Sequence, residues 1–370
     1  MDNPKYINEL QALRGIAAFA VMIGHCLIYY DIPPLLASIA LFFNGRSAVV
    51  VFFVLSGYVL TRSWRETAFD RTNIVRFYLQ RAFRIYPAIW AASALGLIYL
   101  FFLHWQIPVP GTSDFFKDRF HADRFNTFFI LISIAGVGSF ILPQLWSICI
   151  EIIASIALPG IAFAVMHRPR VACGIFLIFL TASFTYGEQS YYQILLYFMD
   201  FLVGAFIAMP GDGIYRAAAA VPARPVFWTS LLGLALTQYL PLDYFSPIAH
   251  LAETTLAAVA IGILVAAKTR ISVMRSKPLL FLGDISYSIY LLHFVVLCVL
   301  AKALALMEAK LGFASSTASS SILVTMVTVA VTVPLAWLSY NYVERPGIRA
   351  GKFAILWLQS NDVLFPRTAP

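Results

Sequence analysis

The sequence predicts an all-α protein of the polytopic membrane class, a bundle of about ten transmembrane helices. Apolar residues make up 61% of its 370 residues and charged residues only 12%, and the mean hydropathy is +0.81. Soluble domains contain roughly 45–50% apolar and 25% charged residues. This composition excludes a soluble enzyme, a disordered protein and a coiled coil, and one helical bundle accounts for the whole length.

Ten stretches are long and apolar enough to be read as membrane spans. They are residues 12–30, 46–61, 85–104, 145–166, 171–186, 191–209, 226–242, 250–267, 279–300 and 321–342. The first is not a signal peptide, because Asp2 and Glu9 interrupt its basic flank and no small-residue cleavage site follows. We expect one membrane domain over residues 1–350 and a cytoplasmic tail over residues 351–370.

The positions of the basic residues orient the bundle. With ten spans and both termini in the cytoplasm, 20 of the 26 lysines and arginines lie in cytoplasmic segments. If the ambiguous stretch 127–142 also crossed the membrane, only 10 of the 26 would do so. The positive-inside rule therefore favours ten spans, with 127–142 short of a full crossing and the loop 105–144 on the outer side.

The net charge of +8 does not indicate nucleic-acid binding, because the basic residues occupy short gaps between apolar runs. The four cysteines lie inside apolar runs with neither CxxC spacing nor histidines at zinc-finger spacing. We therefore expect no nucleic-acid partner, no disulfide framework and no metal.

Four ionisable residues within the predicted spans stand out, namely His25, Glu151, Asp200 and His293. Such groups are costly in a bilayer and often mark function. At about 1.5 Å per residue, His25, Glu151 and His293 reach similar depths, which predicts a buried acid–base site. The alternative is that each is a polar group joining helices, the interpretation we prefer for Asp200.

Three arginines are candidate anion ligands. Arg14 precedes His25 by 11 residues, which returns an α-helix to nearly the same face about three turns away. Arg81 and Arg84 are spaced i, i+3 on one face. Guanidinium groups match phosphate oxygens, so a cytoplasmic phosphorylated donor is one interpretation. A snorkelling Arg14 and topogenic or lipid-binding arginines are the alternative.

The sequence resembles the acyltransferase 3 family of membrane-bound O-acyltransferases, which act on carbohydrates and some other acceptors. Six motifs carry the resemblance in order: LQALRGIAAFAVMIGHC at 10–26, FFVLSGY at 52–58, RAFRIYP at 81–87, LWSICIEI at 145–152, FLGDISYSIYLLH at 281–293 and YVERP at 342–346. Two positions depart from the pattern, because Val50 and Ile152 stand where many members have carboxylates.

The resemblance implies transfer of an acyl group, in the simplest case from acetyl-CoA, to a hydroxyl of a carbohydrate or glycolipid at the inner membrane. Arg14, Arg81 and Arg84 would hold the acyl-CoA. His25 would act as general base or, less simply, carry the acyl group; Glu151 would orient it and His293 would stabilise the oxyanion. The rival hypothesis is a transporter or flippase of a lipid-linked substrate, since membrane-embedded ionisable groups also suit proton relays.

Overall fold

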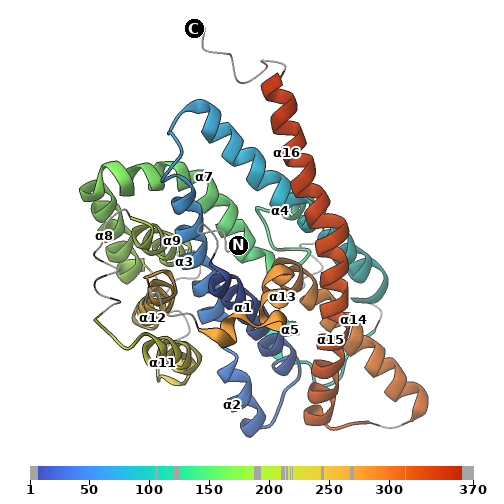
Figure 1. Ribbon diagram of the computed structural model, residues 1–370. Coiled ribbons are helices and arrows are strands. Elements are labelled where there is room, and N and C mark those ends of the chain that lie inside the picture. Colours follow the sequence, from blue (N-terminus) through green and yellow to red (C-terminus); the bar gives the residue numbers. More distant parts are fainter. Residues whose placement is uncertain are drawn as a thin grey trace.

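The computed structural model describes residues 7–104, 107–117, 119, 126–186, 193–209, 213, 216, 218, 220–242, 246–266, 271–312 and 314–360. In this part of the chain the secondary structure is helical, apart from one isolated antiparallel bridge between Tyr30 and Thr112. The predicted all-α membrane bundle is therefore confirmed (Figure 1).

The helices lie in the following order. They are α1 Asn8–Leu27, α2 Pro34–Phe42, α3 Gly45–Ser63, α4 Arg71–Tyr99, α5 Asp114–Lys117, α6 Thr127–Ile134, α7 Leu145–His167, α8 Pro169–Tyr186, α9 Gln193–Ile207, α11 Ala223–Leu236, α12 Pro247–Ala266, α13 Lys277–Asp284, α14 Ser286–Leu311, α15 Thr317–Ser339 and α16 Arg345–Ser360. Turns of π-helix follow α4 at Leu100–His104 and α15 at Tyr340–Glu344, and 3₁₀ turns lie at Thr237–Tyr239 and Ser272–Arg275.

Eight helical segments of the described chain are long and apolar enough to cross a membrane, where the sequence predicts ten spans. The difference lies in residues 191–209 and 226–242, where α9 has 15 residues and α11 has 14. A helix of 14 residues extends about 21 Å, less than the hydrocarbon core of about 30 Å. α11 ends in a 3₁₀ turn just before Pro241, which has no N–H to continue a helix.

The stretch 127–142 does not cross the membrane as one helix. α6 has eight residues, about 12 Å. The chain then turns at Gly136, whose φ of 74° lies in the left-handed region that favours glycine. This geometry agrees with the interpretation of 127–142 as a partial insertion.

Close helix contacts fix α1 and α3, the two helices that carry the first two motifs. A Cβ on Gly204 of α9 would lie 2.0 Å from the carbonyl oxygen of Val54 on α3, and a Cβ on Gly15 of α1 would lie 2.6 Å from the backbone nitrogen of Gly283 on α13. Small residues allow such backbone approach between membrane helices. Gly15 thus sets the position of α1 against α13.

The C-terminal helices form one long rod. The segment Thr317–Ser360 is helical over 44 residues, about 66 Å, which is twice the thickness of the hydrocarbon core. Figure 1 shows α16 continuing the direction of α15 past the rest of the bundle, beside α4. The expected boundary between membrane domain and tail, at residues 350 and 351, falls inside α16, and residues 361–370 lie outside the described chain.

A buried ion pair joins the start of α3 to α12. Arg46 and Glu253 are 5% and 0% exposed, and Arg46 Nε lies 2.9 Å from Glu253 Oε2. Thr237 and Asn44 also donate to the Glu253 carboxylate, at 2.7 and 3.2 Å. Removal of the Glu253 carboxylate would therefore take one hydrogen-bond acceptor from each of the three groups that donate to it.

We expect Glu253→Ala to lower the free energy of unfolding by about 3–5 kcal/mol, because it removes the carboxylate that pairs with the buried Arg46 charge. Unfolding of the purified protein in detergent measures the change. The double variant Arg46→Met/Glu253→Leu should recover most of the lost stability, since it removes both charges. Equal stability of Glu253→Ala and the unsubstituted chain would contradict this account of the network.

Candidate active site

Two histidines meet inside the bundle. His25 lies in the last turn of α1 and His293 in the first half of α14. His25 Nδ1 lies 3.0 Å from His293 Nε2, and the two rings are nearly parallel, 5.2 Å apart. The structure therefore brings together two of the three residues expected to form a buried acid–base site.

The hydrogen bonds of the pair determine which nitrogen carries each proton in the neutral state. His293 Nδ1 lies 3.0 Å from the carbonyl oxygen of Ile289, which can only accept, so His293 carries its hydrogen on Nδ1. Its Nε2 then accepts, and His25 must donate through Nδ1. The lone pair of His25 is left on Nε2, the atom that can act as a base.

Aromatic rings enclose His25 on the side away from its helix. Phe115 stacks on the imidazole at 6.0 Å, and Phe116 and Phe294 meet it edge-on at 6.4 and 5.7 Å. Phe115 and Phe116 belong to the short α5, within the loop 105–144 that the sequence places outside. Backbone hydrogen bonds from Ser113 to Tyr29 (2.9 Å) and from Asp31 to Gly111 (2.8 Å) attach this loop to the end of α1.

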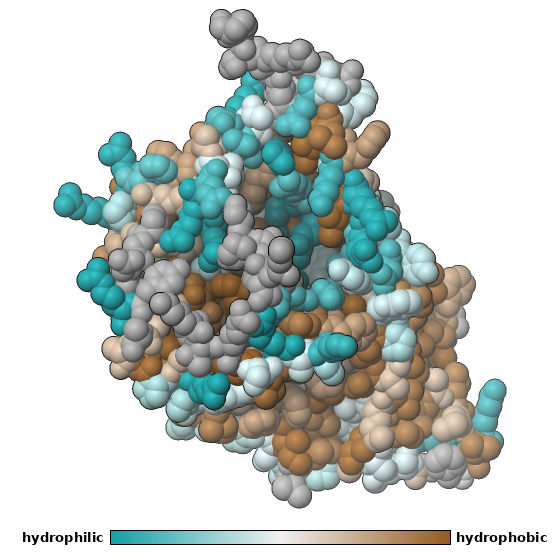
Figure 2. Space-filling model, viewed as in Figure 1, coloured by the Kyte–Doolittle hydropathy of each residue, from teal (hydrophilic) through white to brown (hydrophobic). Residues whose placement is uncertain are grey.

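A pocket of about 910 Å³ opens between α1, α3, α4, α7 and α14. Figure 2 shows hydrophilic residues gathered around a hollow beside α4 and α16, whereas hydrophobic residues cover much of the lower half of this face. The polar and charged residues lining it are Gln11, Arg14, Ser56, Tyr58, Arg62, Ser63, Arg65, Glu66, Thr67, Arg81, Arg84, Ser147, Glu151, Asp284, Ser286, Tyr287, Tyr290, Tyr340 and Glu344.

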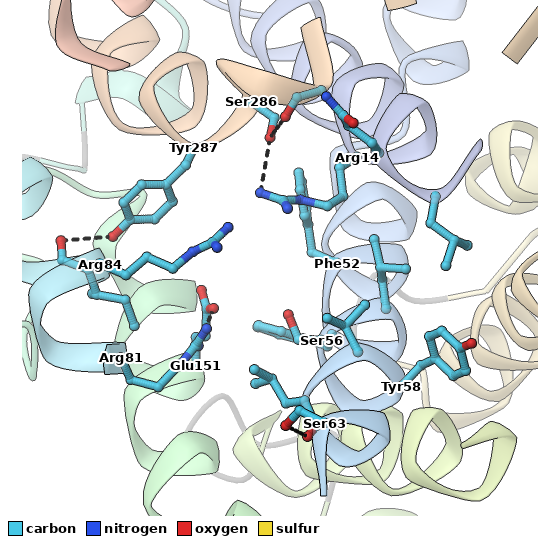
Figure 3. Close-up of a pocket in the computed structure, with 18 of the residues that line it drawn as sticks. Arg14, Phe52, Ser56, Tyr58, Ser63, Arg81, Arg84, Glu151, Ser286 and Tyr287 are labelled. Carbon is cyan, nitrogen blue, oxygen red and sulfur yellow. Dashed lines mark hydrogen bonds and ion pairs between the residues drawn. The ribbon is translucent and has the colours of Figure 1, made fainter. Parts of the chain in front are cut away.

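All three arginines singled out from the sequence line this pocket. Arg14 donates to Ser286 Oγ at 3.3 Å, and Arg81 donates to Glu151 at 2.6 Å and to Ser155 at 3.0 Å. Figure 3 shows the Arg84 guanidinium pointing into the space between α4 and α3, toward Arg14. Within the described part of the chain, the Arg84 side chain makes no hydrogen bond or ion pair, so the five N–H groups of its guanidinium remain available to a ligand.

Glu151 does not take the place expected for it. Its carboxylate pairs with Arg81 on the pocket wall (Figure 3), and no described contact joins it to His25. Depth along the membrane normal, on which the expectation rested, does not say which helices are neighbours. Glu151 is therefore placed to hold a pocket arginine rather than to orient the imidazole.

Carboxylates balance part of the positive charge at the pocket. Gln11 donates to Asp284 at 2.5 Å. Glu344 is buried and accepts a hydrogen bond from Ser288. The pocket thus combines fixed guanidinium groups with a smaller number of carboxylates.

Several pocket residues were not singled out from the sequence. Ser56 and Tyr58 lie in FFVLSGY, Tyr287 and Tyr290 in FLGDISYSIYLLH, and Glu344 in YVERP. Their position inside the motifs is the sequence feature that could have identified them. A serine or tyrosine in an apolar run cannot otherwise be told from a residue of the core. All six motifs contribute residues to this one pocket, although 334 positions separate Leu10 from Glu344.

Asp200 lies in a separate buried cluster. Its carboxylate meets His250 Nε2 at 3.1 Å and Thr254 Oγ1 at 2.6 Å, between α9 and α12. This agrees with its interpretation as a structural group joining two helices. Among the residues that the structure describes, no group of three or more His, Cys, Asp or Glu is arranged to hold a metal ion.

Comparison with known proteins identifies the family. The model of the acyltransferase domain family matches residues 7–341. The chain belongs to this family. The resemblance to the family is thereby confirmed, and the match covers five of the six motifs and ends one residue before YVERP. With eight apolar helices in its described part, the chain is a multi-pass membrane protein. No solved structure matches it.

Its relatives include two kinds of acyltransferase. The peptidoglycan O-acetyltransferase OatA of Listeria monocytogenes is 23% identical over 375 residues, covering 92% of this chain and 56% of the relative. The O-acetyltransferase OatA of Staphylococcus aureus is 22% identical over 399 residues, covering 100% and 61%. The acyltransferase MdmB of Streptomyces mycarofaciens is 26% identical over 373 residues, covering 92% and 91%. This chain therefore spans less than two thirds of either OatA protein.

Proposed function

We propose that this chain is an O-acyltransferase that moves an acyl group, in the simplest case acetyl, from cytoplasmic acyl-CoA to a hydroxyl of a carbohydrate or glycolipid. One observation carries the proposal. Arg14 and His25 lie on one face of α1, with Arg14 in an arginine-lined pocket and His25 in the imidazole pair, about 16 Å apart along the helix. The relatives, which are named as acyltransferases and O-acetyltransferases, support the same reaction class.

The pocket suits the phosphates of coenzyme A. Arg14 and Arg84 approach the same space from α1 and α4 (Figure 3), and Arg62 and Arg65 also line the pocket. Guanidinium groups bind phosphate oxygens through paired, charge-assisted hydrogen bonds. In this proposal Arg81, held by Glu151, shapes the wall, and Arg84 supplies the principal phosphate contact.

The basic end of the bundle gives the direction of entry. The pocket is lined by Arg62 and Arg65 at the end of α3 and by Arg81 and Arg84 of α4, the segment that the positive-inside rule assigns to the cytoplasm. Acyl-CoA would enter there from the cytoplasm, and the acceptor would approach His25 from the side of α5. A multi-pass protein with this orientation in a bacterial cell would lie in the inner membrane.

His25 would act as the general base. Its Nε2 takes the proton of the acceptor hydroxyl while that oxygen forms a bond to the thioester carbonyl carbon. The carbon–sulfur bond then breaks, and the proton passes from His25 to the departing sulfur, leaving an ester and the thiol of coenzyme A. Each atom and charge is accounted for without a further reactant.

His293 would position His25 rather than stabilise the oxyanion. In the neutral pair its Nε2 accepts the hydrogen bond of His25, so it has no N–H to offer to a developing oxyanion on that side. The same hydrogen bond fixes the tautomer of His25 and stabilises the imidazolium that forms during the reaction. This proposal replaces the oxyanion role expected for His293 from the sequence.

The test is transfer by the purified chain. Reconstituted in lipid nanodiscs, the protein receives labelled acetyl-CoA and either a chito-oligosaccharide or a lipid-linked peptidoglycan precursor. We expect a labelled, alkali-sensitive ester on the sugar, detected by mass spectrometry as one added acetyl group. Movement of the unmodified lipid-linked substrate across vesicle membranes, without any ester, would favour the flippase alternative and refute the proposal.

A further inference from the structure

One side chain of the pocket also contacts the imidazole pair. Tyr290 lines the inner end of the pocket, and its ring also contacts the ring of His293 at 5.9 Å and that of Phe52 at 6.0 Å. Neither His25 nor His293 lines the pocket. Tyr290 therefore contacts both the space that holds the arginines and the histidine that binds His25.

One face of α14 connects the two ends of this path. Ser286, Tyr290 and His293 follow one another at spacings of four and three residues, so their side chains lie along one helical stripe. Ser286 binds Arg14 at the pocket, and His293 binds His25. The seven helical steps from Ser286 to His293 correspond to about 10 Å along the axis, and Tyr290 lies between these two residues on the same face.

The Tyr290 hydroxyl is held by a short polar chain from α7. It lies 2.6 Å from Ser147 Oγ and 3.4 Å from the carbonyl oxygen of Gln144, to which Ser147 also donates at 3.2 Å. The Ser147 hydroxyl can donate to the Gln144 carbonyl oxygen as well as bond to Tyr290. If the Tyr290 hydroxyl turns to a ligand, Ser147 therefore keeps a hydrogen-bond partner. Tyr290 is 5% exposed, so its hydroxyl acts in a nearly dry environment where such a hydrogen bond is strong.

A buried acceptor beside this chain also lacks a partner. Gln144 is 2% exposed, its Nε2 donates to Leu291, and its Oε1 has no hydrogen-bond partner among the described residues. Buried polar atoms are rarely left unpaired in native proteins. Gln144 does not line the pocket, so this acceptor lies in the wall behind Ser147.

We propose that Tyr290 is a catalytic residue, whose hydroxyl turns from Ser147 to the thioester carbonyl and stabilises the oxyanion of the tetrahedral intermediate. The inference rests on the proposed transfer from acyl-CoA. The Tyr290 O–H donates a hydrogen bond to the carbonyl oxygen while the acceptor oxygen bonds to the carbonyl carbon, and no proton leaves the tyrosine. His293 has no N–H available for the oxyanion. The two residues on this face of α14 therefore act separately: His293 positions His25, and Tyr290 stabilises the oxyanion.

The experiment compares Tyr290→Phe with Tyr78→Phe in nanodiscs. Tyr78, outside the pocket, donates its hydroxyl to the carbonyl oxygen of Ile156 at 2.7 Å, so its variant loses the same type of group elsewhere. We expect Tyr290→Phe to lower kcat about 100- to 1,000-fold, the usual effect of losing one oxyanion donor, with KM for acetyl-CoA unchanged. Tyr78→Phe should keep kcat within about threefold, as expected for a change away from the site.

Two further measurements separate the possible failures. Thermal unfolding of Tyr290→Phe should match that of Tyr78→Phe, and Ser147→Ala should change kcat much less than Tyr290→Phe because the oxyanion donor remains. If Tyr290→Phe folds and transfers acetyl as fast as the unsubstituted chain, the inference is wrong and the proposed function stands. If the unsubstituted chain does not use acetyl-CoA, the proposed function fails and the inference with it.

Discussion

His25→Ala is expected to lower acetyl transfer from acetyl-CoA about 1,000-fold, because it removes the only base in the proposed reaction. The substitution takes away the Nε2 lone pair while leaving the arginine pocket, and it should therefore leave the affinity for coenzyme A unchanged. Single-turnover transfer in nanodiscs and a separate CoA-binding titration measure the two quantities independently.

Variants of His293 provide the control for this prediction. His293→Gln keeps an acceptor for the Nδ1 hydrogen of His25 and should lose less activity than His293→Ala, in which His25 can rotate or adopt the other tautomer. Neither should abolish transfer as His25→Ala does, because the base itself remains. Normal transfer by folded His25→Ala would remove the basis of the catalytic scheme.

Arg84→Ala is expected to raise KM for acetyl-CoA about 10- to 100-fold, the range for losing charge-assisted hydrogen bonds of about 1.5–3 kcal/mol. Its guanidinium points into the pocket, where within the described chain it forms no hydrogen bond or ion pair. The value of kcat should stay within about threefold, since Arg84 binds the donor in ground state and transition state alike.

Arg76→Ala is the matched control for donor binding. Arg76 lies on the same helix, is exposed and does not line the pocket. It carries the same charge near the same membrane surface, so a purely topogenic or lipid-binding role of the arginines would make the two variants behave alike. A KM for Arg76→Ala that rises as far as that for Arg84→Ala would contradict the assignment of Arg84 to the donor phosphates.

The sequence alone predicts the membrane class, most of the spans and the family. These depend on hydropathy over about 20 residues and on short motifs, which are local properties of the chain. The placement of Arg14 and His25 on one face of α1 is equally local, because the period of the α-helix fixes it. In the structure Arg14 lines the pocket and His25 belongs to the imidazole pair.

The tertiary structure alone decides which groups touch. His25 and His293 are 268 positions apart and meet, whereas Glu151, at a similar estimated depth, pairs with Arg81. Depth and charge do not determine the neighbours of a helix, because these depend on where glycines such as Gly15 let two backbones approach. For the same reason Tyr290 has no distinguishing feature in an apolar run until α14 packs beside α7, where its hydroxyl meets Ser147.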